Sequence, residues 1–300
     1  MHTLTNIKIQ SVGKSHCTLG ESPVWCEANQ TLFWVDILEN IIYSYQAEEK
    51  KINSWKVHEH VGFFVVMSNG NLVAGLKSGL HHVYLNNDGK AHTARIDRID
   101  SENINIRFND GMIDSKDRIW CCTMDMKAKN PLGKYYRYDT NLNRSVIDEG
   151  YTIANGPTLS PNESILYTVE TFGNDQIPKG VYAYNLTSFD CINKPRKLLI
   201  DWTGKNTSPD GIVSDHHGNL WIGEFGGNVL RCYSPNGQLK LELALPAWNI
   251  TKIAIRYAPH LIIYAASARL GVSENILGQY PLTGNILEIT GIDEYQHLKN

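Results

Sequence analysis

The stretch that indicates the fold reads NTSPDGI at residues 206–212 and continues with HHGNLWIGE at residues 216–224. It places the carboxylate of Asp210 between a proline and a glycine, and a polar turn then leads into an apolar strand. The same order recurs elsewhere in the chain, with an oxygen-bearing side chain at the matching place before each strand. These side chains are Glu21, Asn109, Asn155 and Asp210. We interpret them as parts of one site assembled from separate repeats.

The apolar strand that follows each polar turn gives the period of the repeat. Six positions are equivalent, and the differences between their residue numbers run from 40 to 54: Leu32, Leu72, Ile119, Leu166, Leu220 and Ile263. Copies of this length, rich in Val, Ile, Tyr and Trp, are typical of a propeller with four-stranded blades. Turns such as Asn87-Asp88-Gly89 and Pro235-Asn236-Gly237 are typical of hairpins. The sequence therefore predicts an all-β fold, a six-bladed β-propeller that forms a single domain over residues 1–300.

The ends of the chain are predicted to close the ring. A closed propeller commonly completes its last blade with a strand from the other terminus, so we expect Asn6–Val12 to pair beside Asn285–Thr290. Helix signals are almost absent. Three longer connections are expected to form surface loops that shape a rim, at Gly173–Gly180, Ser188–Pro195 and Ala268–Pro281.

Composition excludes several classes of function. Hydrophobic residues make up 42% of the chain and charged residues 20%, which is typical of a globular protein. The net charge of -3 and the lack of a basic cluster argue against nucleic acid as a partner. No stretch predicts a signal peptide or a membrane span. We expect a cytoplasmic protein, a monomer or small homo-oligomer, whose ligands are small molecules.

The six cysteines are too few and too scattered to indicate a disulfide framework, and none belongs to a C-x-x-C motif. We expect reduced thiols. Cys121 and Cys122 are adjacent within a predicted strand, so their side chains should point to opposite faces.

The recurring oxygen side chains favour a cation site. Carboxylate and carboxamide oxygens suit a hard divalent cation such as calcium, magnesium or manganese, with zinc or ferrous iron also possible. The alternative for each position alone is that Asp and Asn beside Gly and Pro only form turns. Recurrence in register across the repeats favours the site.

Several motifs together resemble the SMP-30/gluconolactonase/regucalcin family over nearly the whole chain. They are Gly20-Glu21-Ser22-Pro23-Val24-Trp25, Arg107-Phe108-Asn109-Asp110-Gly111, Thr123-Met124-Asp125, Ala154-Asn155-Gly156, Ser208-Pro209-Asp210-Gly211 and Ser267-Ala268-Arg269. The resemblance implies a six-bladed propeller that binds one divalent cation in its channel and hydrolyses sugar lactones.

The resemblance also implies roles for individual residues. Glu21, Asn155 and Asp210 would be the metal ligands, and Arg107 and Asn109 would contact the substrate. Downstream of the Thr-Met pair, similar proteins have a substrate-facing glutamate, and the corresponding residue of this chain is Lys127. This departure leaves the sugar open and makes Lys127 a further candidate for substrate binding.

For lactone hydrolysis we assign Asp210 as the general base that acts on the attacking water. Arg107 would stabilise negative charge or anchor ring hydroxyls; its alternative is a solvated charge at a strand end. The competing hypothesis for the whole protein is a divalent-cation-binding propeller without catalysis, serving as a scaffold.

Other motifs favour structural interpretations. His58-Glu59-His60 could place two imidazoles on one strand face, but no third nitrogen or sulfur ligand is evident for a transition metal. Trp25, Trp34, Trp120 and Trp221 occupy equivalent strand positions and are expected to pack the blades.

Overall fold

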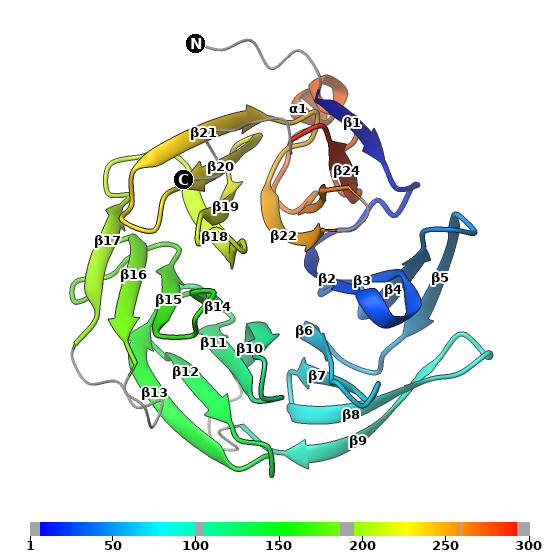
Figure 1. Cartoon of the computed structure of the whole chain (residues 1–300), viewed down its shortest axis with the longest axis horizontal. Coiled ribbons are helices and arrows are strands. Elements are labelled where there is room, and N and C mark those ends of the chain that lie inside the picture. Colours follow the sequence, from blue (N-terminus) through cyan, green and yellow to red (C-terminus); the bar gives the residue numbers. More distant parts are fainter. Residues whose placement is uncertain (1–6, 100–104, 187–194, 258–259, 293–300) are drawn as a thin grey trace.

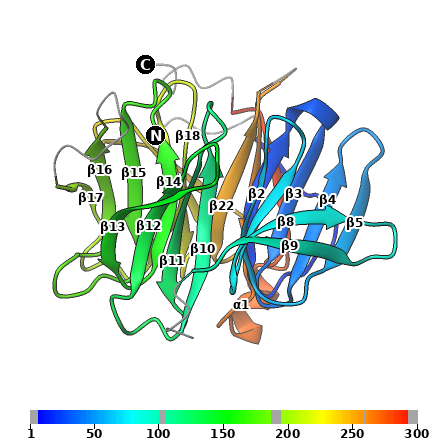
Figure 2. The same cartoon turned by 90° about the horizontal axis from the view of Figure 1, so that it is seen from below.

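Six four-stranded antiparallel sheets form a closed ring (Figure 1). The computed structural model describes residues 7–99, 105–186, 195–257 and 260–292. Seen from the side, the sheets stand around a common axis (Figure 2). The predicted all-β, six-bladed propeller is confirmed.

Five blades are consecutive in the chain. Blade 1 has β2 (Gly20–Cys26), β3 (Thr31–Asp36), β4 (Ile41–Gln46) and β5 (Lys51–Lys56); blade 2 has β6 (Val61–Val66), β7 (Leu72–Leu76), β8 (Gly79–Leu85) and β9 (Ala91–Asp97); blade 3 has β10 (Ile106–Ile113), β11 (Ile119–Asp125), β12 (Gly133–Tyr138) and β13 (Arg144–Tyr151). Blade 4 has β14 (Ala154–Leu159), β15 (Ile165–Glu170), β16 (Gly180–Asn185) and β17 (Lys197–Asp201); blade 5 has β18 (Ser208–Ser214), β19 (Leu220–Phe225), β20 (Val229–Tyr233) and β21 (Leu239–Ala244). The first strand of each blade lies nearest the axis, and the six equivalent positions predicted from the repeats all fall on second strands.

Blade 6 joins the two ends of the chain. It contains β22 (Ile250–Arg256), β23 (Ile262–Ser267), β24 (Leu287–Thr290) and, on its outer edge, β1 (Lys8–Ser11). The register pairs Lys8 with Thr290 and Ser11 with Leu287. The predicted closure is confirmed for the described residues; Asn6 lies outside them.

The long connection over residues 268–281 contains a helix that the sequence analysis missed, α1 (Glu274–Gln279). The hydroxyl oxygen of its N-cap, Ser273, accepts a hydrogen bond from the N–H of Ile276 at 3.4 Å. A single helix of six residues has too few turns for a periodic apolar pattern. The predicted insertion at 188–195 lies almost entirely outside the described residues. No helix in the described ranges is both long and apolar enough to span a membrane.

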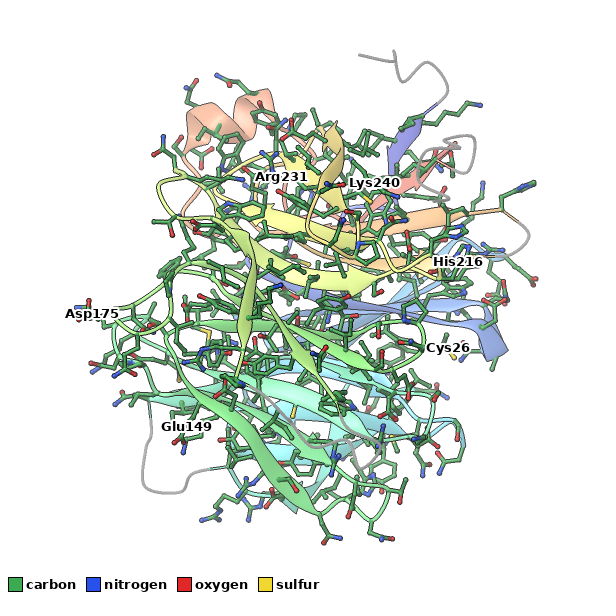
Figure 3. All side chains as sticks on the ribbon, turned by 60° about the vertical axis from the view of Figure 1, so that its left-hand side comes forward. Cys26, Glu149, Asp175, His216, Arg231 and Lys240 are labelled. Carbon is green, nitrogen blue, oxygen red and sulfur yellow. The ribbon has the colours of Figure 1, made fainter. Side chains whose placement is uncertain are left out.

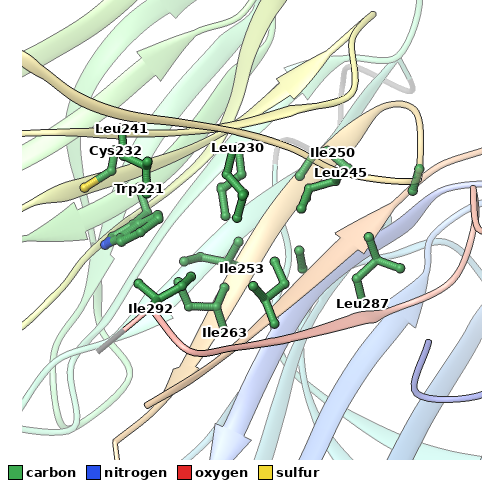
Figure 4. Close-up of a cluster of buried hydrophobic side chains, with 14 residues drawn as sticks. Trp221, Leu230, Cys232, Leu241, Leu245, Ile250, Ile253, Ile263, Leu287 and Ile292 are labelled. Carbon is green, nitrogen blue, oxygen red and sulfur yellow. The ribbon is translucent and has the colours of Figure 1, made fainter. Parts of the chain in front are cut away.

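The core consists of apolar clusters that lie between neighbouring blades. Side chains alternate between the two faces of a strand, so each sheet contributes to two clusters. Cys121 packs with the side chains of blade 2 and Cys122 with those of blade 4, as predicted. Figure 4 shows the cluster between blades 5 and 6, where Trp221 and Leu230 meet Ile253 and Leu287. The five cysteines within the described residues are free thiols; Cys191 lies outside them.

Two of the predicted packing tryptophans are also fixed by turn carboxylates. The indole N–H of Trp120 donates to Asp114 at 2.8 Å, and that of Trp221 donates to Asp215 at 3.0 Å. Each aspartate also accepts backbone N–H groups of its own turn. These turns fix the start of the second strand in blades 3 and 5, and with it the register of the innermost strand.

Candidate active site

Every innermost strand has a β-bulge close to its first residues. The register against the second strand shifts between Glu21/Val24, Val61/Phe63, Phe108/Asp110, Asn155/Thr158, Pro209/Ile212 and Ile250/Ile253. A bulge bends the strand and re-aims the side chains next to it. The predicted site residues Glu21, Asn109, Asn155 and Asp210 all lie at or within these shifts. The recurrence in the sequence therefore has a structural basis, because blades 1, 3, 4 and 5 use the same irregularity to turn these side chains toward the axis.

One cavity of about 440 Å³ opens where these bulges meet. Five of the six residues singled out from the sequence line it: Glu21, Arg107, Asn109, Asn155 and Asp210. They come from blades 1, 3, 4 and 5 and are all buried. Lys127 is exposed and is not among the lining residues, although its neighbours Met126 and Ala128 are. The structure brings five predicted residues together and leaves the sixth, Lys127, outside the lining, between two residues that belong to it.

A chain of hydrogen bonds fixes the polar residues of blades 3 and 4. The Arg107 guanidinium donates to Asn109 Oδ1 at 2.7 Å, and Asn109 Nδ2 donates to Asn155 Oδ1 at 2.8 Å. Asn155 Nδ2 in turn donates to the hydroxyl of Thr171 at 2.8 Å. Arg107 also donates to the carbonyl of Phe108 at 2.9 Å, through the same nitrogen, so its other N–H groups are available to the cavity. These bonds restrict the positions of the Arg107, Asn109 and Asn155 side chains.

The two carboxylates of the site have few partners. Glu21 accepts one hydrogen bond, from the N–H of Ser22 at 2.6 Å, and within the described part of the chain Asp210 accepts none. Burial raises the pKa of Glu21 to about 8, and the charge of Asp110 adds to this rise. Burial, Glu21 and Asp110 raise the pKa of Asp210 well above its usual range, while Arg107 and Lys252 act in the opposite direction. The site thus concentrates negative charge that its own hydrogen bonds do not compensate.

These residues fit a hard divalent cation. Two buried carboxylates and the carboxamide of Asn155 provide oxygen donors of the kind that such cations prefer. With all three carboxyl groups ionised, Glu21, Asp110 and Asp210 would carry three negative charges against the positive charges of Arg107 and Lys252, an excess of one negative charge that a bound cation would offset. Across the described ranges, no three His, Cys, Asp or Glu side chains come together as a metal-binding group. The donor set therefore depends on Asn155 as its third member.

A buried ion pair crosses the channel beside this site. Lys252 Nζ lies 2.5 Å from Asp110 Oδ1 and 3.2 Å from the carbonyl oxygen of Gly111. Lys252 belongs to β22 of blade 6 and Asp110 to β10 of blade 3, which stand on opposite sides of the axis (Figure 1). The Lys252 stem passes over Gly211, where a Cβ atom would lie 2.6 Å from the Cβ and Cγ atoms of the lysine. Glycine after Asp210 is therefore required for this bridge.

Sequence reasoning missed Lys252, although one signal was present. A lysine stands inside the apolar stretch Ile250–Ile255 of an innermost strand, and a charge there must be paired. It also missed Thr171, which has no sequence signal because it lies beyond the end of β15.

The histidine motif is divided between two environments. His58 and His60 lie in the loop between β5 and β6 rather than on a strand face. His58 Nε2 lies 3.1 Å from Glu59, whereas His60 lines the cavity. The two imidazoles do not form a common metal site, and the sequence analysis did not predict the position of His60 at the cavity.

Comparison with known proteins identifies the family. The model of the SMP-30/gluconolactonase/LRE-like region matches residues 19–269, which include all the polar residues of the candidate site. The chain belongs to this family. It is 29% identical to 6-deoxy-6-sulfogluconolactonase of Pseudomonas putida over 93% of each chain. It is 28% identical to L-arabinolactonase of Azospirillum brasilense, covering 90% of this chain and 87% of the relative.

A solved structure is similar to this member of the SMP-30/gluconolactonase/LRE-like family. Regucalcin from Agrobacterium tumefaciens, described as a calcium-binding protein, superposes with a TM-score of 0.85 and 20% identity, over 95% of this chain and 94% of that one. At this identity the likeness supports the propeller fold, and the family assignment comes from the sequence match.

Proposed function

We propose that this protein hydrolyses a sugar lactone in the cavity, with a divalent cation held by Glu21, Asn155 and Asp210. The observation that carries the proposal is the meeting of these three oxygen donors with Arg107 and Asn109 in one cavity. Asn109 also positions the ligand Asn155, but cation binding alone would not need the guanidinium of Arg107. The names of the relatives, a sulfogluconolactonase and an arabinolactonase, support the same class of reaction.

Hydrolysis adds water to the lactone carbonyl and then breaks the ring C–O bond, giving a hydroxy acid. In this proposal Asp210 accepts the proton of the attacking water; burial raises the pKa of its carboxyl, which strengthens it as a base once it is ionised, and Arg107 and Lys252 oppose that rise. The free N–H groups of Arg107 are suited to the oxygen that gains negative charge in the tetrahedral intermediate. Asn109 orients Arg107. When bound, the cation would act as a Lewis acid that polarises the carbonyl.

The experiment that tests this proposal is an assay of metal-free and reconstituted protein against a panel of sugar lactones. Chelation is expected to abolish hydrolysis, and a divalent cation to restore it. Full hydrolysis by protein shown to be metal-free would contradict the cation requirement. Stoichiometric cation binding without turnover of any lactone would favour a non-catalytic cation-binding propeller, which the likeness to a calcium-binding protein also suggests.

Glu21→Gln is expected to weaken cation binding, because a charged ligand becomes neutral while its shape is kept. Calorimetric titration of the metal-free protein measures the affinity directly. Glu49→Gln is the matched control, since Glu49 is exposed in a turn of the same blade. Equal cation affinity in the two variants would remove Glu21 from the ligand set.

We further propose that Lys127 interacts with an anionic or hydroxyl group of the substrate at the rim. Its N–H donates to Asp125 Oδ1 at 3.1 Å, which fixes the start of the loop, and its side chain is exposed. The relative named 6-deoxy-6-sulfogluconolactonase has, by its name, a sulfonated substrate. A lysine at this position suits such a group.

Lys127→Glu is expected to lower kcat/KM for an anionic lactone about fivefold relative to a neutral one, the scale of a charge interaction in water. Cation affinity should not change. Lys129→Glu is the control, because Lys129 is exposed in the same loop and one of its two neighbours, Ala128, lines the cavity, whereas both neighbours of Lys127 do. The same ranking of lactones in both variants would make Lys127 an ordinary solvated residue.

A further inference from the structure

Blade 2 has no polar side chain on its innermost strand at the site. The residue within its bulge is Gly62, where a Cβ atom would lie 2.1 Å from the carbonyl oxygen of Phe108, so no other residue fits there. The polar group that blade 2 contributes comes from the preceding loop: His60 lines the cavity together with Glu21, Arg107 and Asp210. The proposed function assigns no role to this imidazole.

The hydrogen bonds of His60 determine which ring nitrogen carries the proton. Nδ1 lies 3.0 Å from the carbonyl oxygen of Ile37 and 2.9 Å from Asn40 Oδ1. A backbone carbonyl can only accept, so Nδ1 of a neutral imidazole must be the donor whichever way the Asn40 amide is turned. Nε2 is then a hydrogen-bond acceptor. It has no partner among the described residues.

The side chains around His60 offer a substrate few other hydrogen-bond acceptors. The nearby lining from the loops of blades 1 and 6 is apolar, formed by Leu19, Ile37, Leu38 and Leu270. On the other side of the cavity, the amide nitrogen of Asn109 donates to the side-chain oxygen of Asn155, and the amide nitrogen of Asn155 donates to the hydroxyl of Thr171. Apart from the carboxylate of Glu21, which the proposed function assigns to the cation, Nε2 of His60 is the side-chain acceptor that the described lining offers a substrate hydroxyl on this side.

Building on the proposed lactone hydrolysis, we propose that His60 is a specificity-determining residue whose Nε2 accepts a hydrogen bond from one hydroxyl group of the substrate. The loss of one such bond is worth about tenfold in affinity. The chemistry selects a lactone with a free hydroxyl on the side that faces blades 1 and 2. A lactone that lacks this hydroxyl leaves Nε2 without a partner.

Two substitutions separate substrate contact from structure. In His60→Asn, the amide nitrogen can replace Nδ1 and keep the bond to Ile37, but no atom replaces Nε2. In His60→Gln, the longer side chain returns a polar group near Nε2 and loses the bond to Ile37. We expect His60→Asn to keep the melting temperature and to raise KM about tenfold with a smaller change in kcat. His60→Gln should retain most of the wild-type KM and melt at a lower temperature.

The deciding measurement compares a lactone-shaped ligand with its monodeoxy analogues. Glucono-1,5-lactam, in which a ring N–H resists hydrolysis, and its monodeoxy forms are titrated calorimetrically into wild-type and His60→Asn protein. Wild type should bind one monodeoxy lactam about tenfold more weakly than the parent. His60→Asn should bind the parent about tenfold more weakly and no longer distinguish it from that analogue.

Two results would overturn the assignment of His60. One is a parent lactam affinity in His60→Asn equal to that of wild type; the other is an equal loss for the parent and every analogue, which indicates displacement of the site. If wild type hydrolyses lactones while His60→Asn keeps its KM, the proposed function stands and the role of His60 is wrong. If wild type hydrolyses none, the proposed function is wrong, and the lactam affinities decide the role of His60 separately.

Discussion

Lys252→Met is expected to lower the free energy of unfolding by about 3–5 kcal/mol, because it removes one partner of a buried ion pair. Asp110 is fully buried, and its remaining hydrogen bonds come from two backbone N–H groups, those of Gly111 at 2.6 Å and Gly156 at 3.1 Å. The charges of Glu21 and Asp210 lie close to it. Methionine retains most of the lysine stem over Gly211, so the effect reports on charge rather than volume. Denaturant unfolding of the metal-free protein measures it.

The double variant Lys252→Met/Asp110→Asn is the control. Removing both charges leaves no unpaired ion in the channel, and replacing a buried pair by neutral groups is often close to neutral in stability. The double variant should therefore recover most of the lost free energy, and a double-mutant cycle gives the coupling between the two side chains. If the single and double variants are equally unstable, packing rather than charge explains the loss.

The same pair predicts a pH dependence. Burial raises the pKa of the Asp110 carboxyl, and Lys252 opposes that rise. Without Lys252 the pKa of Asp110 rises further, so the folded variant binds more protons than the unfolded chain above the ordinary pKa of an aspartate. Stability then falls as the pH rises through this window. The difference in unfolding free energy between wild type and Lys252→Met should be larger at pH 8 than at pH 5, and an equal difference would contradict the assignment.

The fold could be predicted because the same local pattern is repeated in every blade. Leu32, Leu166 and Leu220 are themselves fully buried and mark second strands, and each is preceded by a turn with its own residue preferences. Ring closure by β1 was predictable as well. The N-terminal segment alternates apolar and polar residues as a strand does, and it belongs to none of the six repeats. The helix α1 was not, since six residues with one Ser cap are too short to differ from a loop.

The candidate site was only partly readable from the sequence. Glu21, Asn155 and Asp210 stand at matching positions of the repeat, so the spacing of the repeats along the chain was enough to predict that they belong to one site. His60 breaks that period, because it precedes its strand while Gly62 occupies the bulge of blade 2. Distance along the chain is a poor guide to which loops lie together. Asp175 is in the loop after β15 and His216 is in the turn after β18, and the two lie on opposite sides of the molecule (Figure 3). Whether two residues lie at the same end of the central channel depends on the direction of the strands that carry them.

Asp210→Asn, supplied with saturating cation, is expected to lose roughly 10²-fold or more in kcat, the usual scale of general base catalysis, while it retains substrate affinity. The side chain is buried at the cavity, accepts no hydrogen bond from the described residues, and is held within the bulge of β18 between Pro209 and Gly211. Such a carboxylate has its lone pairs available for a water. Asparagine keeps the shape and one oxygen donor but removes the basicity. Steady-state kinetics on a sugar lactone, with cation affinity measured separately, distinguish the two roles of this residue.

The interpretation depends on the response to cation. If Asp210 is only a ligand, excess cation should restore turnover in Asp210→Asn, because the remaining oxygen still binds at high concentration. If Asp210 is the base, kcat stays low however much cation is added. Asp201→Asn is the matched control, since that carboxylate is exposed at the outer edge of blade 4 and should leave kcat unchanged. A cation-saturated Asp210→Asn enzyme with near-normal kcat would remove Asp210 as the base, since proton transfer would then not depend on its carboxylate.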